Sequence, residues 1–295
     1  MKVVTTISDV RAITGLAHKA GETVGFVPTM GALHDGHRSL MKAARSECGS
    51  VGVSVFVNPT QFGPGEDFDT YPRALAADEA ICKAENVDWL FAPPVSEMFP
   101  DSARTTVHVS GLTEVLCGLT RPGHFDGVTT VVAKLFLICG SGRAYFGRKD
   151  AQQLAVVRQM VKDLNLPIAV IDCPTVREKD GLAMSSRNAG LSANERQAAT
   201  VIPRALRQVL DQIVAGERSP RAVAKMLTEM LASEPIAQVE YVEVVDADTL
   251  TSLICEPVSP LTGNVLLAVA VRFGSVRLID NASVVIENNG PEVVY

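Results

Sequence analysis

The sequence of 295 residues lacks an apolar run long enough to cross a bilayer. A spanning helix needs about 20 apolar residues. The longest run, within 128–139, is interrupted by Thr129, Thr130 and Lys134. The first four residues lead into polar residues without the apolar core of a signal peptide. We therefore expect a cytoplasmic protein that does not bind a membrane.

Cysteine pairs and metal-ligand patterns are also lacking. The six cysteines include no C-x-x-C pair, and most lie in apolar runs, which indicates buried free thiols in a reducing compartment. The five histidines form no metal-ligating pattern with them. His34 and His37 are the closest pair, and no third ligand lies nearby at a recognised spacing. The identity of any metal ligand stays unknown at this stage.

An excess of basic charge is missing as well. The 27 Lys and Arg residues against 33 Asp and Glu residues give a net charge of −6, which argues against broad nucleic-acid binding. Basic residues that cluster should therefore bind a small anionic ligand. The hydrophobic content of 47% is ample for a buried core, and the length suggests about two domains.

Apolar periodicity predicts strands that alternate with helices up to about residue 175, and this alternation is typical of a parallel sheet. The expected strands are 23–28, 51–57, 87–92, 104–109, 144–147 and 167–174, and the expected helices are 9–20, 34–47, 72–85, 127–139 and 151–164. Helices at 194–215 and 220–231 then precede strands at 239–245, 265–273 and 275–279. We predict an α/β fold, with a Rossmann-like domain over 1–175 and a smaller α+β domain over 176–295.

The stretch from Gly25 to His37 predicts a strand, a turn and a helix start, with two histidines three residues apart. Early helix amides and the positive end of the helix dipole can hold an anion such as a phosphate. Imidazoles at i and i+3 lie on one helix face and can donate hydrogen bonds to charge that forms there. Alternatively, the Gly and Pro only shape a turn, and the histidines cap the helix or lie half-buried.

Two further loops carry polar side chains that can reach a ligand. Asn58 and Gln61 follow the second strand, and ligands of open α/β sheets bind at the carboxyl ends of strands. Their amides suit a hydroxyl or a carboxylate, although Asn is also an ordinary turn residue. The glycine-rich loop around Arg121 either reaches the same site or is a structural turn with a surface arginine.

Basic residues recur at two later junctions. Lys149 and Asp150 lie at a helix start, where a lysine suits a phosphate and an aspartate is a natural N-cap. Ser185, Ser186 and Arg187 could hold a triphosphate and follow its charge to the leaving pyrophosphate. A solvated helix start and a polar interdomain linker are the simpler interpretations of these two segments.

Taken together and in order, these fragments closely resemble the pantothenate synthetase family, also called the pantoate–beta-alanine ligases. The segments that carry the resemblance are Val27–His37, Phe56–Phe62, Tyr71–Arg73, Arg121–Phe125, Lys149–Asp150 with Gln152–Gln153, Asp180–Asn188 and Arg277–Asn281. They extend over nearly the whole chain. The resemblance implies a homodimeric, Mg2+-dependent ligase of the HIGH-type nucleotidyltransferase superfamily, which condenses pantoate with beta-alanine at the expense of ATP, through a pantoyl adenylate.

The resemblance also implies roles for individual residues. ATP would be bound by Met30, Gly31, Ala32, Leu33, His34, Asp35, Gly36, His37, Gly147, Arg148, Lys149, Asp150, Val176, Met184, Ser185, Ser186 and Arg187. His34, His37, Lys149 and Arg187 would be catalytic and contact its phosphates. The family assigns a proton donor at the position of His37; the first step has no obvious proton to transfer, so we favour charge stabilisation. Gln61, Gln153 and Asn58 would bind pantoate, with Gln61 also near beta-alanine.

One departure and two alternatives accompany this hypothesis. The family usually has Glu at the position of Arg148, so either ATP is contacted there by backbone or a side-chain role is lost. A related nucleotidyltransferase that adenylylates a phosphate acceptor would share the histidine turn but has no need of Gln61 and Gln153. A non-catalytic nucleotide-binding protein would release no pyrophosphate. Size and acidic charge disfavour an aminoacyl-tRNA synthetase.

Overall fold

The computed structural model describes residues 1–255, 259–287 and 290–294. The chain divides into two compact units. The N-terminal unit consists of Met1–Glu114, Gly118–Arg148 and Val156–Cys173. The C-terminal unit consists of Val115–Cys117, Lys149–Ala155 and Pro174–Tyr295. The domain boundary at 175/176 stays a prediction, because the C-terminal unit also includes two short earlier segments.

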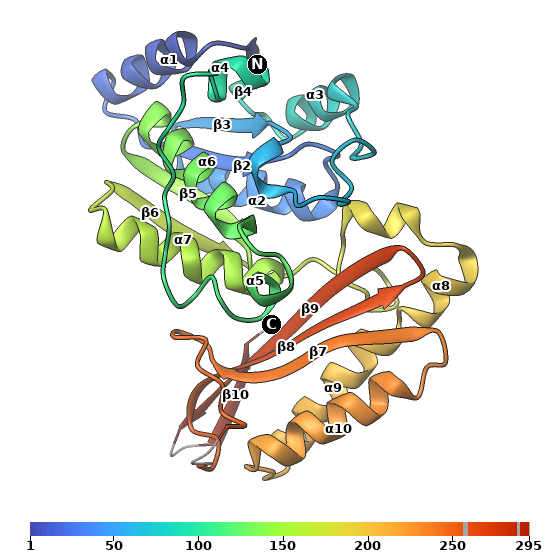
Figure 1. The fold of residues 1–295 in the computed structure, drawn as a ribbon. Coiled ribbons are helices and arrows are strands. Elements are labelled where there is room, and N and C mark those ends of the chain that lie inside the picture. Colours follow the sequence, from blue (N-terminus) through green and yellow to red (C-terminus); the bar gives the residue numbers. More distant parts are fainter. Residues whose placement is uncertain (256–258, 288–289, 295) are drawn as a thin grey trace. The chain divides into compact units, whose positions relative to one another are not determined.

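The N-terminal unit is built on a parallel sheet of six strands in the order β1-β4-β3-β2-β5-β6 (Figure 1). The strands are β1 (Lys2–Val4), β2 (Val24–Thr29), β3 (Ser50–Val55), β4 (Trp89–Phe91), β5 (Gly142–Gly147) and β6 (Ile168–Cys173). The helices are α1 (Ile7–Lys19), α2 (Asp35–Glu47), α3 (Leu75–Ala84), α4 (Val95–Met98), α5 (Cys117–Thr120), α6 (His124–Cys139) and α7 (Ala151–Asp163), with 3-10 turns η1 (Pro59–Gln61) and η2 (Arg148–Asp150). This sheet and its helices confirm the α/β prediction.

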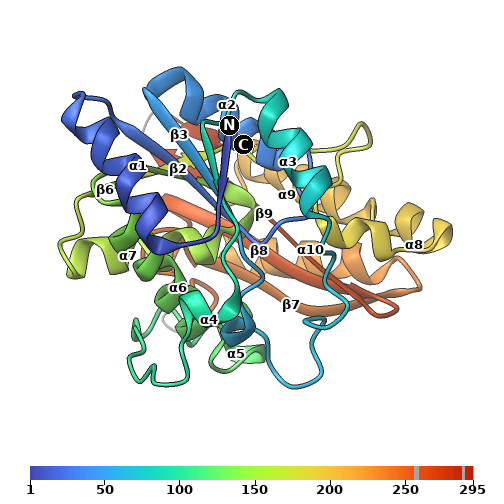
Figure 2. The ribbon, with the colours of Figure 1, turned by 90° about the horizontal axis from the view of Figure 1, so that it is seen from above.

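The strand order places the helices on both faces of the sheet. Right-handed crossovers that step in opposite directions along a sheet lie on opposite faces. The steps from β2 to β3 and β4 therefore put α2 and α3 on one face, and the steps toward β5 and β6 put α6 and α7 on the other, with α1 packed on α6 (Figure 2). All six strands are parallel, so their carboxyl ends share one edge, where the turn after β2 and the loop after β3 lie.

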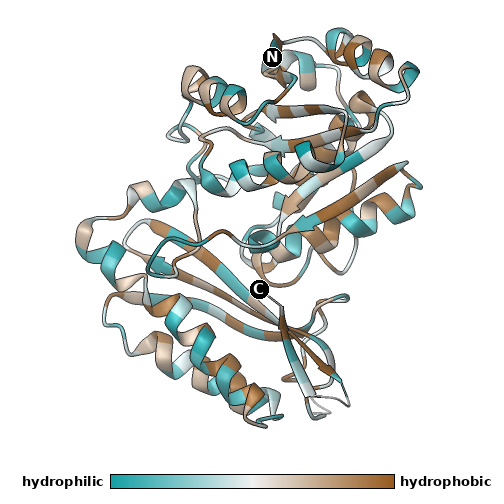
Figure 3. Cartoon of the chain, turned by 180° about the vertical axis from the view of Figure 1, so that it is seen from behind, coloured by the Kyte–Doolittle hydropathy of each residue, from teal (hydrophilic) through white to brown (hydrophobic). Residues whose placement is uncertain are grey.

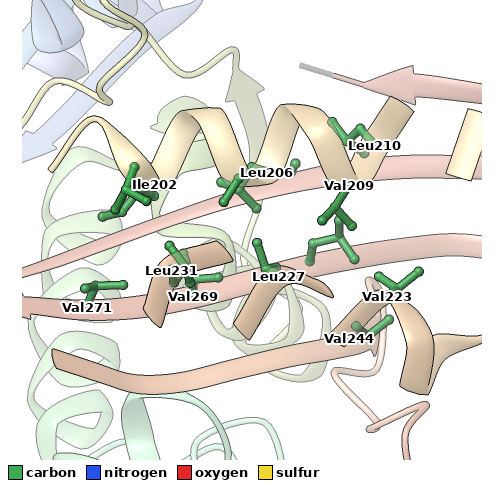
Figure 4. Packing of buried hydrophobic residues seen from close by; sticks show 14 of the residues in the cluster. Ile202, Leu206, Val209, Leu210, Val223, Leu227, Leu231, Val244, Val269 and Val271 are labelled. Atoms are coloured by element: carbon green, nitrogen blue, oxygen red, sulfur yellow. The ribbon is translucent and has the colours of Figure 1, made fainter. Parts of the chain in front are cut away.

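The C-terminal unit packs two helices on a four-stranded antiparallel sheet in the order β10-β9-β8-β7. Its elements are the 3-10 turn η3 (Ser186–Gly190), helices α8 (Ala193–Ala198), α9 (Val201–Val214) and α10 (Pro220–Ala232), and strands β7 (Ala237–Asp246), β8 (Gly263–Phe273), β9 (Val276–Glu287) and β10 (Gly290–Val294). In Figure 3 both hydrophilic and hydrophobic residues occur along the two long helices. Their apolar sides meet the sheet, as Ile202, Leu227 and Val269 show in Figure 4.

Two expected elements are wrong. Residues 104–109 form no strand, because α6 provides the hydrogen-bond partners that a neighbouring strand would offer. The Val107 amide donates to Thr130 Oγ1 (2.9 Å), and Thr129 Oγ1 donates to the Val107 carbonyl (2.5 Å). The single helix expected over 194–215 is divided into α8 and α9 at residues 199–200. Pro203 has no amide hydrogen for the carbonyl four residues earlier, so one continuous helix cannot form there.

Candidate active site

The two histidines lie at the start of α2 and cap it. His34 is the N-cap, and its Nδ1 accepts a hydrogen bond from the Gly36 amide at 3.1 Å. The His34 amide donates in turn to His37 Nδ1 at 3.3 Å, and the two rings lie 4.2 Å apart between centroids. Since each Nδ1 accepts a backbone hydrogen, the proton of a neutral ring lies on Nε2 in both histidines. The structure therefore shows that both histidines take part in capping α2.

Asp78 of α3 holds the turn that precedes these histidines. Its carboxylate accepts the amide hydrogens of Ala32 (3.2 Å) and Leu33 (2.8 Å). Asp78 is only 2% exposed, and burial raises its pKa although both hydrogen bonds lower it. Gly31 has φ +89°, and a Cβ there would lie 2.9 Å from an Asp78 oxygen. The turn thus needs glycine at this position, and Asp78 supports the turn through a contact that the sequence interpretation missed.

Asn58 and Gln61 form one hydrogen-bonded pair after β3. Asn58 is 1% exposed; its Nδ2 donates to Gln61 Oε1 (3.0 Å) and to the Gly127 carbonyl (3.1 Å). Its Oδ1 accepts from the Thr60 amide (3.2 Å). Because Gln61 Oε1 faces Asn58, the amide group Nε2 is directed the other way, and it lies 2.9 Å from Met30 Sδ in the histidine turn. The structure therefore brings Gln61 to the turn, as the sequence predicted for this edge.

Arg121 reaches the same loop through two partners. Its guanidinium binds both Glu66 oxygens at 2.6 Å and lowers the pKa of Glu66 from 4.5 to about 2. Arg121 also donates to His124 Nε2 (3.0 Å), and His124 Nδ1 donates to the Gln61 carbonyl (2.7 Å). Of the two interpretations of Arg121, the surface arginine is therefore wrong. The arginine helps to hold the backbone of Gln61.

Arg148, at the position where the family usually has Glu, is engaged in an ion pair. Its Nε lies 2.5 Å from Asp172 Oδ2 on β6, and Arg158 binds the other oxygen of Asp172. These two arginines lower the pKa of Asp172, although burial of the carboxylate opposes the effect. The side chain of Arg148 is thus committed to a contact within the N-terminal unit.

Lys149, Asp150 and Gln153 lie at the start of α7, in the segment Lys149–Ala155 that groups with the C-terminal unit, although the rest of α7 belongs to the N-terminal unit. Lys149 and Asp150 belong to η2, and Lys149 Nζ is 3.7 Å from Asp150 Oδ1. The carbonyl of Lys149 accepts a hydrogen bond from Asn281 Nδ2 at 2.8 Å. The preceding glutamine, Gln152, is 6% exposed and binds Val115 and Cys117 through its amide. Gln153, on the same first turn, is half-buried.

The segment from Val176 to Arg187 forms a short hairpin followed by η3. The Met184 amide donates to the Val176 carbonyl (2.9 Å), and the Glu178 amide donates to the Leu182 carbonyl (2.8 Å). Ser185 is the N-cap of η3 and accepts from the Arg187 amide (3.2 Å). The predicted residues thus form two sets. The N-terminal unit contains Met30–His37, Asn58, Gln61, Gly147 and Arg148. The C-terminal unit contains Lys149, Asp150, Gln153, Val176 and Met184–Arg187.

Neither a metal-ligand cluster nor a membrane-spanning helix is present among the described residues. Residues 1–255, 259–287 and 290–294 contain no group of three His, Cys, Asp or Glu side chains placed to hold a metal ion. Over the same ranges, no helix has the length and apolar character to cross a membrane.

A parallel α/β sheet, with a histidine-capped helix and buried amides at the carboxyl ends of its strands, defines a class of protein that binds a small ligand at that edge. The pantoate–beta-alanine ligase family model matches residues 2–283. The pantothenate synthetase of Acetivibrio thermocellus is 52% identical over 284 residues, which is 96% of this chain and 99% of that one. The enzyme of Heliobacterium modesticaldum is 52% identical over 281 residues, or 95% and 98% of the two chains.

Solved structures agree with this result. A pantothenate synthetase structure from Thermus thermophilus matches with a TM-score of 0.89 and 47% identity, over 95% of this chain and 98% of that one. The Francisella tularensis pantoate–beta-alanine ligase, complexed with beta-gamma ATP and beta-alanine, matches with a TM-score of 0.76 and 35% identity, over 95% and 97%. The chain belongs to the pantoate–beta-alanine ligase family and is a ligase.

Proposed function

We propose that the protein condenses pantoate with beta-alanine in two steps, through a pantoyl adenylate. In the first step a pantoate carboxylate oxygen attacks the α-phosphorus of ATP, and the bond to the β-phosphate oxygen breaks to release pyrophosphate. In the second step the beta-alanine amine attacks the acyl carbon, loses a proton and displaces AMP. Activation is needed because the oxide of a free carboxylate is a poor leaving group. Family membership and the ATP and beta-alanine bound to the Francisella tularensis enzyme support this proposal.

The backbone hydrogen bonds accepted by Nδ1 of His34 and His37 are the observation that carries the proposal. With both Nδ1 atoms occupied by backbone hydrogens, the Nε2–H groups serve as preorganised donors to the ATP phosphates. Negative charge moves toward the leaving pyrophosphate as the first step proceeds, and two fixed donors stabilise it without reorganisation. This role is charge stabilisation rather than proton donation by His37, since the first step transfers no proton.

The amides of Gln61 and Gln153, supported by Asn58, bind pantoate in this proposal. Asn58 already fixes Oε1 of Gln61, so the Nε2 group of Gln61 is the donor that faces a substrate carboxylate or hydroxyl. Gln61 also lies near beta-alanine when that substrate is bound. Loss of the Asn58 contact would let the Gln61 amide rotate and weaken pantoate binding.

We assign four segments to ATP: the turn Met30–His37, Gly147–Asp150, Val176 and Met184–Arg187. Lys149 and Arg187 contact its phosphates in this proposal. Because the Arg148 guanidinium pairs with Asp172, its contact with ATP is made by the backbone. No three-ligand protein site for Mg2+ fits the described residues. Magnesium typically binds one or two carboxylates and substrate phosphates, so we propose that it enters with ATP. We also propose that the protein is a homodimer and that it acts in the cytoplasm.

Pyrophosphate release from ATP tests this function. We expect release with pantoate alone, and AMP together with pantothenate only after beta-alanine is added. Release of pyrophosphate with a phosphate-bearing acceptor in place of pantoate would instead favour an adenylyltransferase. ATP binding without any pyrophosphate would identify a non-catalytic nucleotide-binding protein.

A further inference from the structure

Strand β9 carries a carboxylate at a position where an apolar residue would be expected. Alternate residues of a strand face the same side of a sheet, and Leu278, Ala282 and Val284 of β9 face the core under α9 and α10. Asp280 occupies the same register and is 3% exposed. A buried carboxylate is costly unless it is paired and hydrogen-bonded. Asp280 therefore needs partners that compensate its charge.

A cationic partner comes from the hairpin 176–184. Arg177 NH1 lies 2.6 Å from Asp280 Oδ2, and Arg177 NH2 lies 3.0 Å from Oδ1, so both carboxylate oxygens are bound. The same guanidinium donates to the Gly181 carbonyl (3.1 Å) on the other side of the hairpin. The Arg177 side chain thus joins the hairpin to β9. Val176 and Met184, which we assign to ATP, are the two ends of this hairpin.

The next residue of β9 holds the other ATP-binding segment. Asn281 faces the opposite side of the strand, is 9% exposed, and donates from Nδ2 to the Lys149 carbonyl at 2.8 Å. The backbone amide of Asn281 donates to Asp280 Oδ1 (2.8 Å), so the Asp280 side chain also contacts the main chain at Asn281. All these residues belong to the C-terminal unit.

We propose that Asp280 and Asn281 are positioning residues for ATP. Asp280 fixes the hairpin through Arg177, and Asn281 fixes the backbone of Lys149. Two adjacent residues on opposite faces of one strand thereby set the spacing between the lysine and the hairpin within this unit. The inference rests on the proposed function of Lys149, Val176 and Met184. It assigns a role in the first half-reaction to a strand on which we place no substrate-binding residue.

Asn281→Ala is the variant that separates positioning from folding, because it removes the hydrogen bond to the Lys149 carbonyl without leaving a buried charge. Misplacement by about 1 Å can cost on the order of 100-fold in rate. We expect pyrophosphate release from ATP and pantoate to fall by roughly 10- to 100-fold. The second half-reaction, measured with preformed pantoyl adenylate and beta-alanine, should change far less because the β- and γ-phosphates are absent. A purely structural role would slow both steps equally.

Asn264→Ala is the matched control. Asn264 is on the neighbouring strand β8, and its Nδ2 donates to Asp248 (3.1 Å), remote in sequence from every ATP-binding segment. We expect both half-reactions of this variant to match the wild type within about twofold, a change of about 0.4 kcal/mol. Asp280→Asn, which keeps the shape of the side chain, should resemble Asn281→Ala and provides a second test if that variant folds poorly.

The outcomes are distinguishable. If Asn281→Ala releases pyrophosphate at the wild-type rate, or if both half-reactions slow equally, the inference is overturned while the proposed function stands. If the wild-type protein releases no pyrophosphate, the proposed function fails. The inference is then decided by calorimetric ATP binding, in which Asn281→Ala should weaken affinity severalfold more than Asn264→Ala. Equal affinities of these two variants would overturn it.

Discussion

Two buried carboxylates hold two segments that we assign to ATP, and they do so by different means. Asp78 is 2% exposed and binds two neutral backbone amides of the histidine turn. Asp280 is 3% exposed and binds the charged guanidinium of Arg177. Burial raises the pKa of Asp78, so amides compensate its desolvation only in part. The histidine turn is therefore fixed at its main chain, whereas the hairpin is held to β9 by a charged pair of side chains.

Removal of Asp280 should have the largest effect on stability. Asp280→Ala leaves Arg177 without its carboxylate, and breaking a buried ion pair by removal of one partner costs about 3–5 kcal/mol. Since the Arg177 side chain is 24% exposed and partly reached by water, we expect about 3 kcal/mol. Urea denaturation followed by circular dichroism measures the loss.

The double variant Arg177→Ala, Asp280→Ala provides the control for this prediction. It contains no unpaired charge, so it should be less destabilised than the sum of the two single variants. Additive losses would mean that the two side chains are not coupled, and the contrast with Asp78 would disappear.

His37→Ala should have the largest effect on the chemistry. Loss of one preorganised donor to developing charge typically costs roughly 10²- to 10³-fold in rate. We expect a decrease of that size in pantoate-dependent pyrophosphate release. His108→Ala is the matched control, because His108 is an exposed histidine that pairs with Asp126. A loss below about threefold, which is about 0.7 kcal/mol, would remove His37 from the charge-stabilising role.

The strands of the N-terminal unit were predictable because they are continuous apolar runs between turn residues. Val24–Thr29 and Ser50–Val55 lie within one or two residues of the expected bounds. The short edge strand Lys2–Val4 was missed, since three residues carry little periodicity. Strand β9 was expected to end at 279, because Asp280 and Asn281 interrupt the apolar alternation. In the structure it continues to Glu287. The residues that obscured the strand are the two that we infer to position ATP.

The site was predictable only in part. The motifs around His34, Asn58 and Gln61 identify residues that the structure brings to one edge of the sheet, and their roles stay predictions. Asp78 was missed because its partners are backbone amides 45 and 46 residues away, and no sequence pattern reports such a contact. The sequence did not explain why this chain has Arg148 where the family usually has Glu, because the partner of Arg148, Asp172, lies on β6, 24 residues away.

A smaller effect is expected for Asp78→Asn. An asparagine offers one acceptor oxygen, so one of the two amide hydrogens loses its partner, at a net cost of about 1–2 kcal/mol. The loss is limited because the buried charge of Asp78 is itself unfavourable. Its raised pKa also sets the pH dependence. Protonation is easier in the folded state, so the wild type gains stability over Asp78→Asn as pH falls through this pKa. A wild-type advantage that shrinks on acidification would contradict the assignment.

Glu66→Gln should have the smallest effect and the opposite pH dependence. Arg121 lowers the pKa of Glu66 from 4.5 to about 2, so the ionised form stabilises the folded state above pH 4.5 and this contribution is lost as pH falls toward 2. The Glu66 side chain is 26% exposed, and solvent screening limits the contribution to about 1 kcal/mol. In urea titrations between pH 6 and pH 3, the wild-type advantage over Glu66→Gln should therefore narrow, whereas the advantage over Asp78→Asn widens. If the wild-type advantage over both variants changed in the same direction as pH falls, the prediction would be wrong. The response of a carboxylate to acid would then not depend on whether its partner is a guanidinium or an amide.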